Sequence, residues 1–190
     1  MSAQLLKLPT MTARPREVVV LPDQRFFVRS VALGRDADSG SIREQLELAL
    51  EGMAPFPVNQ MLWGYWTTPE SDHALVFAAY RKRFTAEETE AWGEAEWVGP
   101  QLAALLGEKA PSAATTWMLR TEDGLTAVHF GDDSGVPTLV RSDIVDPEAS
   151  DAAWQRVEDE LVRACGGSKS IKRIAGPSVV AGLPGTDELI

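Results

Sequence analysis

Side chains suited to catalysis or metal binding are few in this chain. Histidine occurs twice, as His73 at the start of a predicted strand and as His129 inside another. His129 with Asp132 and Asp133 has the side chains for a metal site, but aspartates beside glycines are also typical of tight turns, the interpretation we favour. Cys165 falls on the apolar side of a predicted helix, where a thiol is usually a small buried group. The sequence predicts no catalytic residue and no metal site.

Glycine motifs for nucleotides do not occur either. A phosphate loop needs G-x-x-x-x-G-K-[ST], and residues 166–170, GGSKS, lack that spacing. Ser134 is one position away from the nucleophile of a G-x-S-x-G turn, and no base can be assigned to it. The carboxylates fall mostly on the exposed faces of predicted helices, without a placed acid and base pair. We therefore expect a protein that is not an enzyme and that needs no cofactor.

Composition narrows the classes of partner and compartment. The 190 residues are 44% hydrophobic, enough for a substantial core. A net charge of -10, from 18 basic and 28 acidic residues, disfavours nucleic acid as a partner. The single cysteine excludes an internal disulfide framework and suits a reducing compartment. No stretch approaches the roughly 20 apolar residues of a membrane span, so we expect a soluble, cytoplasmic chain.

Local patterns predict two groups of elements with a linker near 107–114, after a tail at 1–16. Residues 17–21 and 25–33 are expected to form a hairpin, followed by a helix that Ser41 and Glu44 open with a capping box. The run 73–81 is apolar on both faces, which is typical of a central strand covered by helices on both sides. The other expected elements of this group are a helix to about residue 53, a strand at 61–67, a capped helix beginning at Thr85 with Glu88, and a strand or short helix at 98–106.

The second group reads as three strands, a helix and a last strand. The expected strands are 115–120, 125–130, 138–145 and 171–174, and the helix runs from Ser150 or Asp151 to Ala164. The order is mixed α/β with two similar halves, at 17–107 and 114–190, and without the alternation of a parallel dinucleotide-binding sheet.

Three apolar residues are candidates for contact with a partner. Leu48 falls among glutamates on the polar side of its predicted helix. Trp63 and Trp66 face opposite sides of one predicted strand, so one of them is either covered by a helix layer or available to a partner. Each of these residues also has an interpretation without a partner. Leu48 would then be a single exposed leucine, and Trp63 and Trp66 would belong to the core.

Six stretches of the sequence together carry a family resemblance: Val18–Pro22, Phe27–Val31, Ile42–Glu51, Pro55–Met61, Thr116–Arg120 and Leu139–Ser142. They resemble the actin-like cytoplasmic domain of bacterial assembly-platform proteins, which are the L protein of type II secretion and the M protein of type IV pili. The resemblance covers about residues 17 to 180 and implies an actin-like (RNase H-like) α/β fold with two small lobes.

Members of the wider actin superfamily bind ATP through two phosphate turns and a Gly-Gly turn. The corresponding segments here are 22–25, 120–124 and 175–178. The first lacks the glycine that lets backbone amides approach a phosphate, the second adds acidic charge where a phosphate would lie, and the third contains a proline, which removes an amide donor. If ATP is bound, the resemblance points to Asp123, Gly124 and Gly176. A divergent ATP-binding member is the alternative to a protein that has lost the nucleotide.

The resemblance implies a scaffold that works at the cytoplasmic face of the bacterial inner membrane. Its implied partners are the motor ATPase of the machine or the short tail of a neighbouring platform protein. An acidic domain of this kind is expected to attract a basic partner segment, with binding that weakens as salt rises. An interaction module unrelated to secretion remains a third possibility.

Overall fold

The computed structural model describes residues 18–34, 39–68, 71–93, 95, 97–106, 114–121, 124–131, 135–167 and 170–175. The predicted tail at 1–16 lies outside them. The strands are β1 (Val18–Leu21), β2 (Phe27–Ala32), β3 (Met61–Thr67), β4 (His73–Tyr80), β5 (Trp97–Pro100), β6 (Thr115–Thr121), β7 (Gly124–Phe130), β8 (Pro137–Ile144) and β9 (Ile171–Ala175). The helices are α1 (Ser39–Met53), α2 (Ala86–Ala91), α3 (Ala103–Leu106) and α4 (Asp151–Ala164), with 3-10 turns η1 (Asp23–Arg25), η2 (Val58–Gln60) and η3 (Arg81–Arg83).

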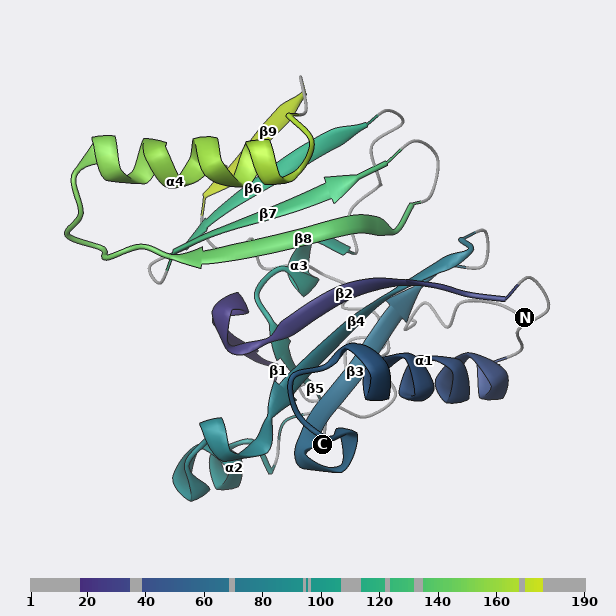
Figure 1. The fold of residues 1–190 in the computed structure, drawn as a ribbon. Coiled ribbons are helices and arrows are strands. Elements are labelled where there is room, and N and C mark those ends of the chain that lie inside the picture. Colours follow the sequence, from purple (N-terminus) through teal and green to yellow (C-terminus); the bar gives the residue numbers. More distant parts are fainter. Residues whose placement is uncertain are drawn as a thin grey trace, which may run out of the picture.

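The first sheet has the order β2-β4-β3, and both pairs are antiparallel. Strand β4 is central, as its apolar sequence predicts, and all but its two end residues are buried. Helix α1 covers one face, where Leu46 and Leu50 are fully buried (Figure 1). The prediction that helices cover both faces is wrong, because Leu75 and Phe77 on the other face join a core shared with the second sheet.

The predicted hairpin of 17–21 with 25–33 is also wrong. Strand β1 pairs in parallel with β5, whereas β2 pairs with β4 in the first sheet. Between them Pro22 precedes the 3-10 turn η1, which carries the chain out of one sheet and into the other. The segment 98–106 contains both of the elements that its sequence allowed, the end of β5 and the short helix α3.

Two of the three predicted helix starts are confirmed. The Thr85 hydroxyl accepts the Glu88 amide at 3.1 Å while the Glu88 carboxylate accepts the Thr85 amide at 2.8 Å, which is a complete capping box. Ser150 caps α4 by accepting the amide of Ala153. Helix α1 instead begins at Ser39, so Ser41 lies inside its first turn and its hydroxyl accepts the Gln45 side-chain amide at 3.0 Å. The Ser41 capping prediction is therefore wrong.

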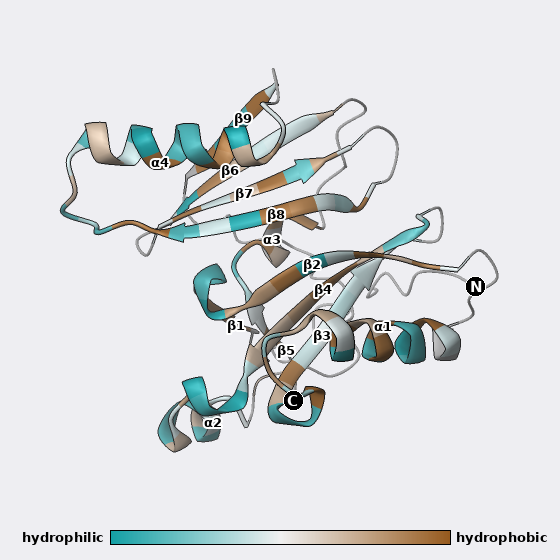
Figure 2. Ribbon diagram, in the orientation of Figure 1, coloured by the Kyte–Doolittle hydropathy of each residue, from teal (hydrophilic) through white to brown (hydrophobic). Residues whose placement is uncertain are grey.

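The second sheet has the order β8-β7-β6-β9, in which the predicted meander β6-β7-β8 is antiparallel and β9 lies parallel to β6. Helix α4 packs on one face through the buried side chains of Trp154, Leu161 and Cys165, as the apolar spacing predicts. The outward side of α4 is hydrophilic (Figure 2). No helix among the described residues is long and apolar enough to cross a membrane.

The main core fills the space between the two sheets. It combines Val28, Leu75 and Phe77 of the first sheet with side chains of the second, among them Trp117 and Phe130, whose rings lie 4.7 Å apart. Trp92, Trp97 and the buried residues of α3 complete it. The chain therefore stacks as α1, first sheet, shared core, second sheet and α4 (Figure 1).

Candidate functional site

The turn between β1 and β2 places a carboxyl group inside the protein. Asp23 is 1% exposed, and its Oδ1 accepts the backbone amide of Leu102 at 2.8 Å. The Thr126 hydroxyl on β7 and the amide of Gln101 lie near this carboxyl group and favour its ionised form, while its buried Oδ2 has no hydrogen-bond partner among the described residues. Burial outweighs these interactions and raises the pKa of Asp23 to about 6. The turn is thereby held against both the start of α3 and the second sheet.

The next residue of the same turn reaches the second sheet directly. The Gln24 side-chain amide donates to the backbone carbonyl of Asp143 on β8 at 3.3 Å. A Cβ added to Gly124, at the start of β7, would lie 2.9 Å from that amide nitrogen and 2.1 Å from the carbonyl oxygen of Asp143. Gly124 also has a φ of 149°, which a side chain disfavours. The β1–β2 turn and the start of β7 are therefore packed against each other.

These contacts bear on the residues that the resemblance assigned to ATP. Gly124 is in close contact with protein atoms, whereas Asp123 and Gly176 lie outside the described residues. The amides that could otherwise bind an external anion already have partners within the chain, because the Leu102 amide donates to Asp23 Oδ1 and the Gln101 amide donates to the Leu21 carbonyl at 3.0 Å. Asp23, Gln24 and Gly124 are thus in close contact with other protein atoms, although Gln24 and Asp143 also border open space.

The three residues proposed for partner contact do not form one surface. Leu48 is 71% exposed on the outer side of α1. Trp63 is half-buried in the cluster beneath α1, where the Arg43 guanidinium lies 5.5 Å from its ring centroid. Trp66 is half-buried against the core between the sheets, so the two tryptophans do face opposite sides of β3 as predicted. Their role in binding stays a prediction.

His129, the residue with the best metal-binding chemistry in the sequence, is bonded within its sheet. Its Nδ1 lies 3.0 Å from the Thr116 hydroxyl on the neighbouring strand. Asp132 and Asp133 lie outside the described residues. Within the part that is described, no group of three or more His, Cys, Asp or Glu side chains could hold a metal ion.

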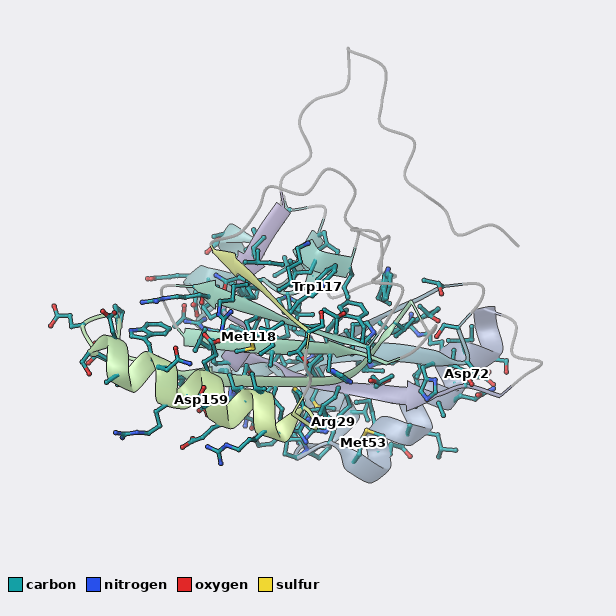
Figure 3. All side chains as sticks on the ribbon, turned by 90° about the horizontal axis from the view of Figure 1, so that it is seen from above. Arg29, Met53, Asp72, Trp117, Met118 and Asp159 are labelled. Carbon is teal, nitrogen blue, oxygen red and sulfur yellow. The ribbon has the colours of Figure 1, made fainter. Side chains whose placement is uncertain are left out.

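Sequence reasoning missed a groove where the edge strands β2 and β8 lie side by side. It has a volume of about 470 Å³, and η1, β2, β8 and the segment after α1 line it. Four arginines and one aspartate line it among the described residues: Arg25, Arg29, Arg83, Arg141 and Asp143. Arg29 lies on the same side of the molecule as Met53, at the end of α1 (Figure 3). No local signal predicts this groove, because its walls are more than a hundred residues apart in sequence.

Solved structures show which known proteins share this architecture. The cytoplasmic domain of EpsL, an inner membrane component of the type II secretion system of Vibrio cholerae, matches 86% of the chain with a TM-score of 0.52 and 16% identity. The PilM-PilN type IV pilus biogenesis complex matches 90% of the chain with a TM-score of 0.54 and 17% identity. The chain has the actin-like fold of these proteins. The fold class predicted from the sequence resemblance is thus confirmed.

The likeness extends over only part of each known protein. This actin-like chain spans 63% of the EpsL domain and 66% of the matched chain of the PilM-PilN complex, less than two thirds of either. No family model matches the chain, and a search of the curated proteins found no match. The shared property is therefore the fold.

Proposed function

We propose that this chain is a non-enzymatic scaffold domain of a type II secretion or type IV pilus assembly platform. Its work would be to dock other components of the machine at the cytoplasmic face of the inner membrane. The partners proposed are the motor ATPase or the cytoplasmic tail of a neighbouring platform protein. The actin-like fold shared with EpsL and the PilM-PilN complex supports this assignment.

The observation that carries the non-enzymatic part is the packed junction at Asp23, Gln24 and Gly124. A phosphate needs unengaged backbone amides and open space, and it is repelled by a nearby carboxylate. Here the Asp23 carboxyl group accepts the Leu102 amide, and Gly124 has no room for even a single added carbon. A triphosphate would have to displace the Gln24 side chain and overcome the charge of Asp23.

The net charge supports a role in binding proteins. At -10, the domain attracts basic segments over a distance of about 10 Å at ordinary ionic strength. Such attraction accelerates association and weakens as salt rises. We therefore propose that part of the acidic surface receives a basic region of the partner.

Calorimetric titration tests the proposal. The chain is titrated with ATP and magnesium at millimolar nucleotide, and separately with the purified motor ATPase and synthetic platform-protein tails from the same organism. We expect no heat of binding with ATP, and saturable binding with one of the protein components that weakens as salt is raised. Saturable magnesium-dependent ATP binding would favour the divergent ATP-binding protein instead. Absence of binding to every platform component would contradict the scaffold role.

A further inference from the structure

The groove between β2 and β8 concentrates positive charge in an acidic protein. The positive charge of Arg25 is neutralised by an ion pair, in which its guanidinium lies 2.7 Å from the Glu88 carboxylate. In the part of the chain that the structure describes, the guanidinium groups of Arg29, Arg83 and Arg141 donate hydrogen bonds only to backbone carbonyls. Three cationic groups therefore line the groove with a single nearby acid, Asp143.

Two of these cations lie near each other on the facing strands. Burial and the like charge of Arg141 lower the pKa of Arg29, so the pair repels. A carboxylate placed between them would relieve this repulsion and accept charge-assisted hydrogen bonds from both. Arg29 is already held in place by its contact with the Phe27 ring, 4.4 Å from the ring centroid, which favours a preformed site.

The edges of the two sheets do not bond to each other across the groove. Strands β2 and β8 are both edge strands, and they belong to separate sheets. The Arg29 guanidinium donates to the Val28 carbonyl at 2.8 Å, and the Arg141 guanidinium donates to the Val140 carbonyl at 3.2 Å. These side chains cover carbonyl groups of the edge strands, which disfavours the addition of another strand. Recognition in the groove would therefore depend on charged and apolar side chains.

The walls of the groove also carry apolar surface. Ile144, at the end of β8, is 75% exposed and lines it. On the opposite wall, Phe56 stacks on Tyr80 with ring centroids 4.0 Å apart. A small inorganic anion would use only the arginines, whereas a peptide with acidic and apolar residues would use both kinds of surface.

We propose that this groove binds a short acidic segment of a protein partner, with its carboxylates at Arg29, Arg83 and Arg141 and an apolar side chain against Ile144. The inference rests on the proposed scaffold function and names the partner chemistry of one surface. The net charge of -10 favours a short segment over an extended polyanion, because nucleic acid or an anionic membrane would meet the acidic remainder of the surface. The same partner could present a basic region to that acidic remainder.

Fluorescence polarisation with defined peptides tests the chemistry of the site. The probe is a short fluorescein-labelled peptide of Asp, Glu and Leu, and its matched control has Asn and Gln in place of the acids. We expect the acidic peptide to bind about tenfold more tightly at low salt, a ratio that falls as salt is raised. Equal affinity of the two peptides would overturn the proposal.

Variants test the place of binding. The double substitution Arg29→Gln with Arg141→Gln should weaken the acidic peptide about tenfold, which corresponds to two partly screened ion pairs. Arg156→Gln with Arg163→Gln removes the same two charges from the exposed surface of α4, outside the groove, and should leave the affinity unchanged. Ile144→Ser should weaken the peptide about threefold and should not affect inorganic phosphate. Circular dichroism checks that each variant is folded.

Competition separates the possible sources of the anion. Inorganic phosphate that displaces the peptide at equal concentration, or an oligonucleotide or phosphatidylglycerol vesicle bound through the same arginines, would overturn the proposal. An acidic peptide insensitive to the double substitution would also overturn it. ATP binding in calorimetry would contradict the scaffold function and leave the peptide result standing. Failure of the peptide, with platform components still bound, would remove only this inference.

Discussion

The two sheets meet in two places of opposite character. At the turn η1, the junction is closed: Asp23 is buried, Gln24 bonds across to β8, and Gly124 has no space for a side chain. Along β2 and β8, the two edges lie beside each other without a shared ladder, and a groove of about 470 Å³ remains. The closed place corresponds to where the actin resemblance puts a nucleotide, and the open place shares Gln24 and Arg25 with the same turn but otherwise lies along β2 and β8.

The polar groups at the two places have different surroundings. At the closed junction the buried carboxyl group of Asp23 accepts the Leu102 amide through Oδ1, and the Thr126 hydroxyl lies near it. At the open groove the charges of Arg29, Arg83 and Arg141 face solvent or backbone carbonyls, with one nearby acid. A buried polar group depends on partners within the fold, whereas an exposed charge is solvated and can pair with a group of another molecule. The junction therefore contributes to stability, and the groove is the better place to look for binding.

The largest expected difference comes from shortening one apolar side chain in the core between the sheets and one at the groove. Phe77 is fully buried in the core between the sheets, so Phe77→Ala should lower the free energy of unfolding by about 3–5 kcal/mol. Ile144 is mostly exposed at the groove, so Ile144→Ala should change the free energy of unfolding by less than about 0.5 kcal/mol. Urea unfolding followed by circular dichroism measures both. Similar losses would show that the groove wall supports the fold as the core does.

The buried carboxyl group predicts a pH dependence specific to the closed junction. Because burial raises the pKa of Asp23 to about 6, the folded chain holds this proton more tightly than the unfolded chain. The resulting stabilisation is complete below the unfolded pKa and is lost as pH rises through about 6. With a pKa raised from 3.8 to about 6, this stabilisation amounts to on the order of 3 kcal/mol.

Asp23→Asn isolates this contribution, because the amide cannot ionise and still offers an oxygen to Leu102. The free energy of unfolding of the natural chain minus that of the variant should fall by the stated amount between about pH 4 and pH 7. Glu88, whose pKa is lowered chiefly by its hydrogen bond with Arg25, has the opposite pH dependence and cancels in the difference. A difference that does not vary with pH would mean that Asp23 titrates as it does in the unfolded chain.

Local sequence patterns predicted the elements better than their partners. The apolar run of β4 predicted its central position, and Thr85 with Glu88 predicted the capped start of α2, because these signals act within a few residues. The hairpin of β1 with β2 was wrong because pairing is decided by packing across the molecule. Strand β1 instead pairs with β5, whose Trp97 is buried in the main core. No spacing rule in the sequence connects residues so far apart.

The same limit applies to the sites. Asp23 follows a proline and reads as an ordinary turn residue, and only the fold shows that α3 and β7 enclose it. Arg29 and Arg141 have no motif in common, and they become one site because two sheet edges lie side by side. The resemblance correctly predicted the fold class, since that depends on the order of elements along the chain.

Two glycines sharpen the comparison with effects of opposite sign. Gly124→Ala should destabilise the chain by about 2 kcal/mol, because the added carbon meets the Asp143 carbonyl oxygen at a φ that a side chain disfavours. Gly52 lies on α1 with no atom within 4 Å of an added carbon, so Gly52→Ala should stabilise it by about 0.5–1 kcal/mol. Thermal unfolding at neutral pH measures the two. If Gly124→Ala left the stability unchanged, the closed junction would be able to accommodate an added carbon.

The smallest expected effect concerns the groove when no ligand is bound. Arg141→Gln removes the charge that repels Arg29 and should raise the free energy of unfolding slightly, by at most about 0.5 kcal/mol at low salt. Screening should abolish this gain at about 1 M salt, where the Debye length is about 3 Å. Arg156→Gln on α4 is the charge-matched control, measured by urea unfolding at both salt concentrations. If only Arg141→Gln raises the free energy of unfolding, and the same variant binds the acidic peptide more weakly, then Arg141 lowers stability while it contributes to binding. Both effects follow from one cause, because the repulsion between Arg29 and Arg141 that a bound anion would relieve is present when the groove is empty.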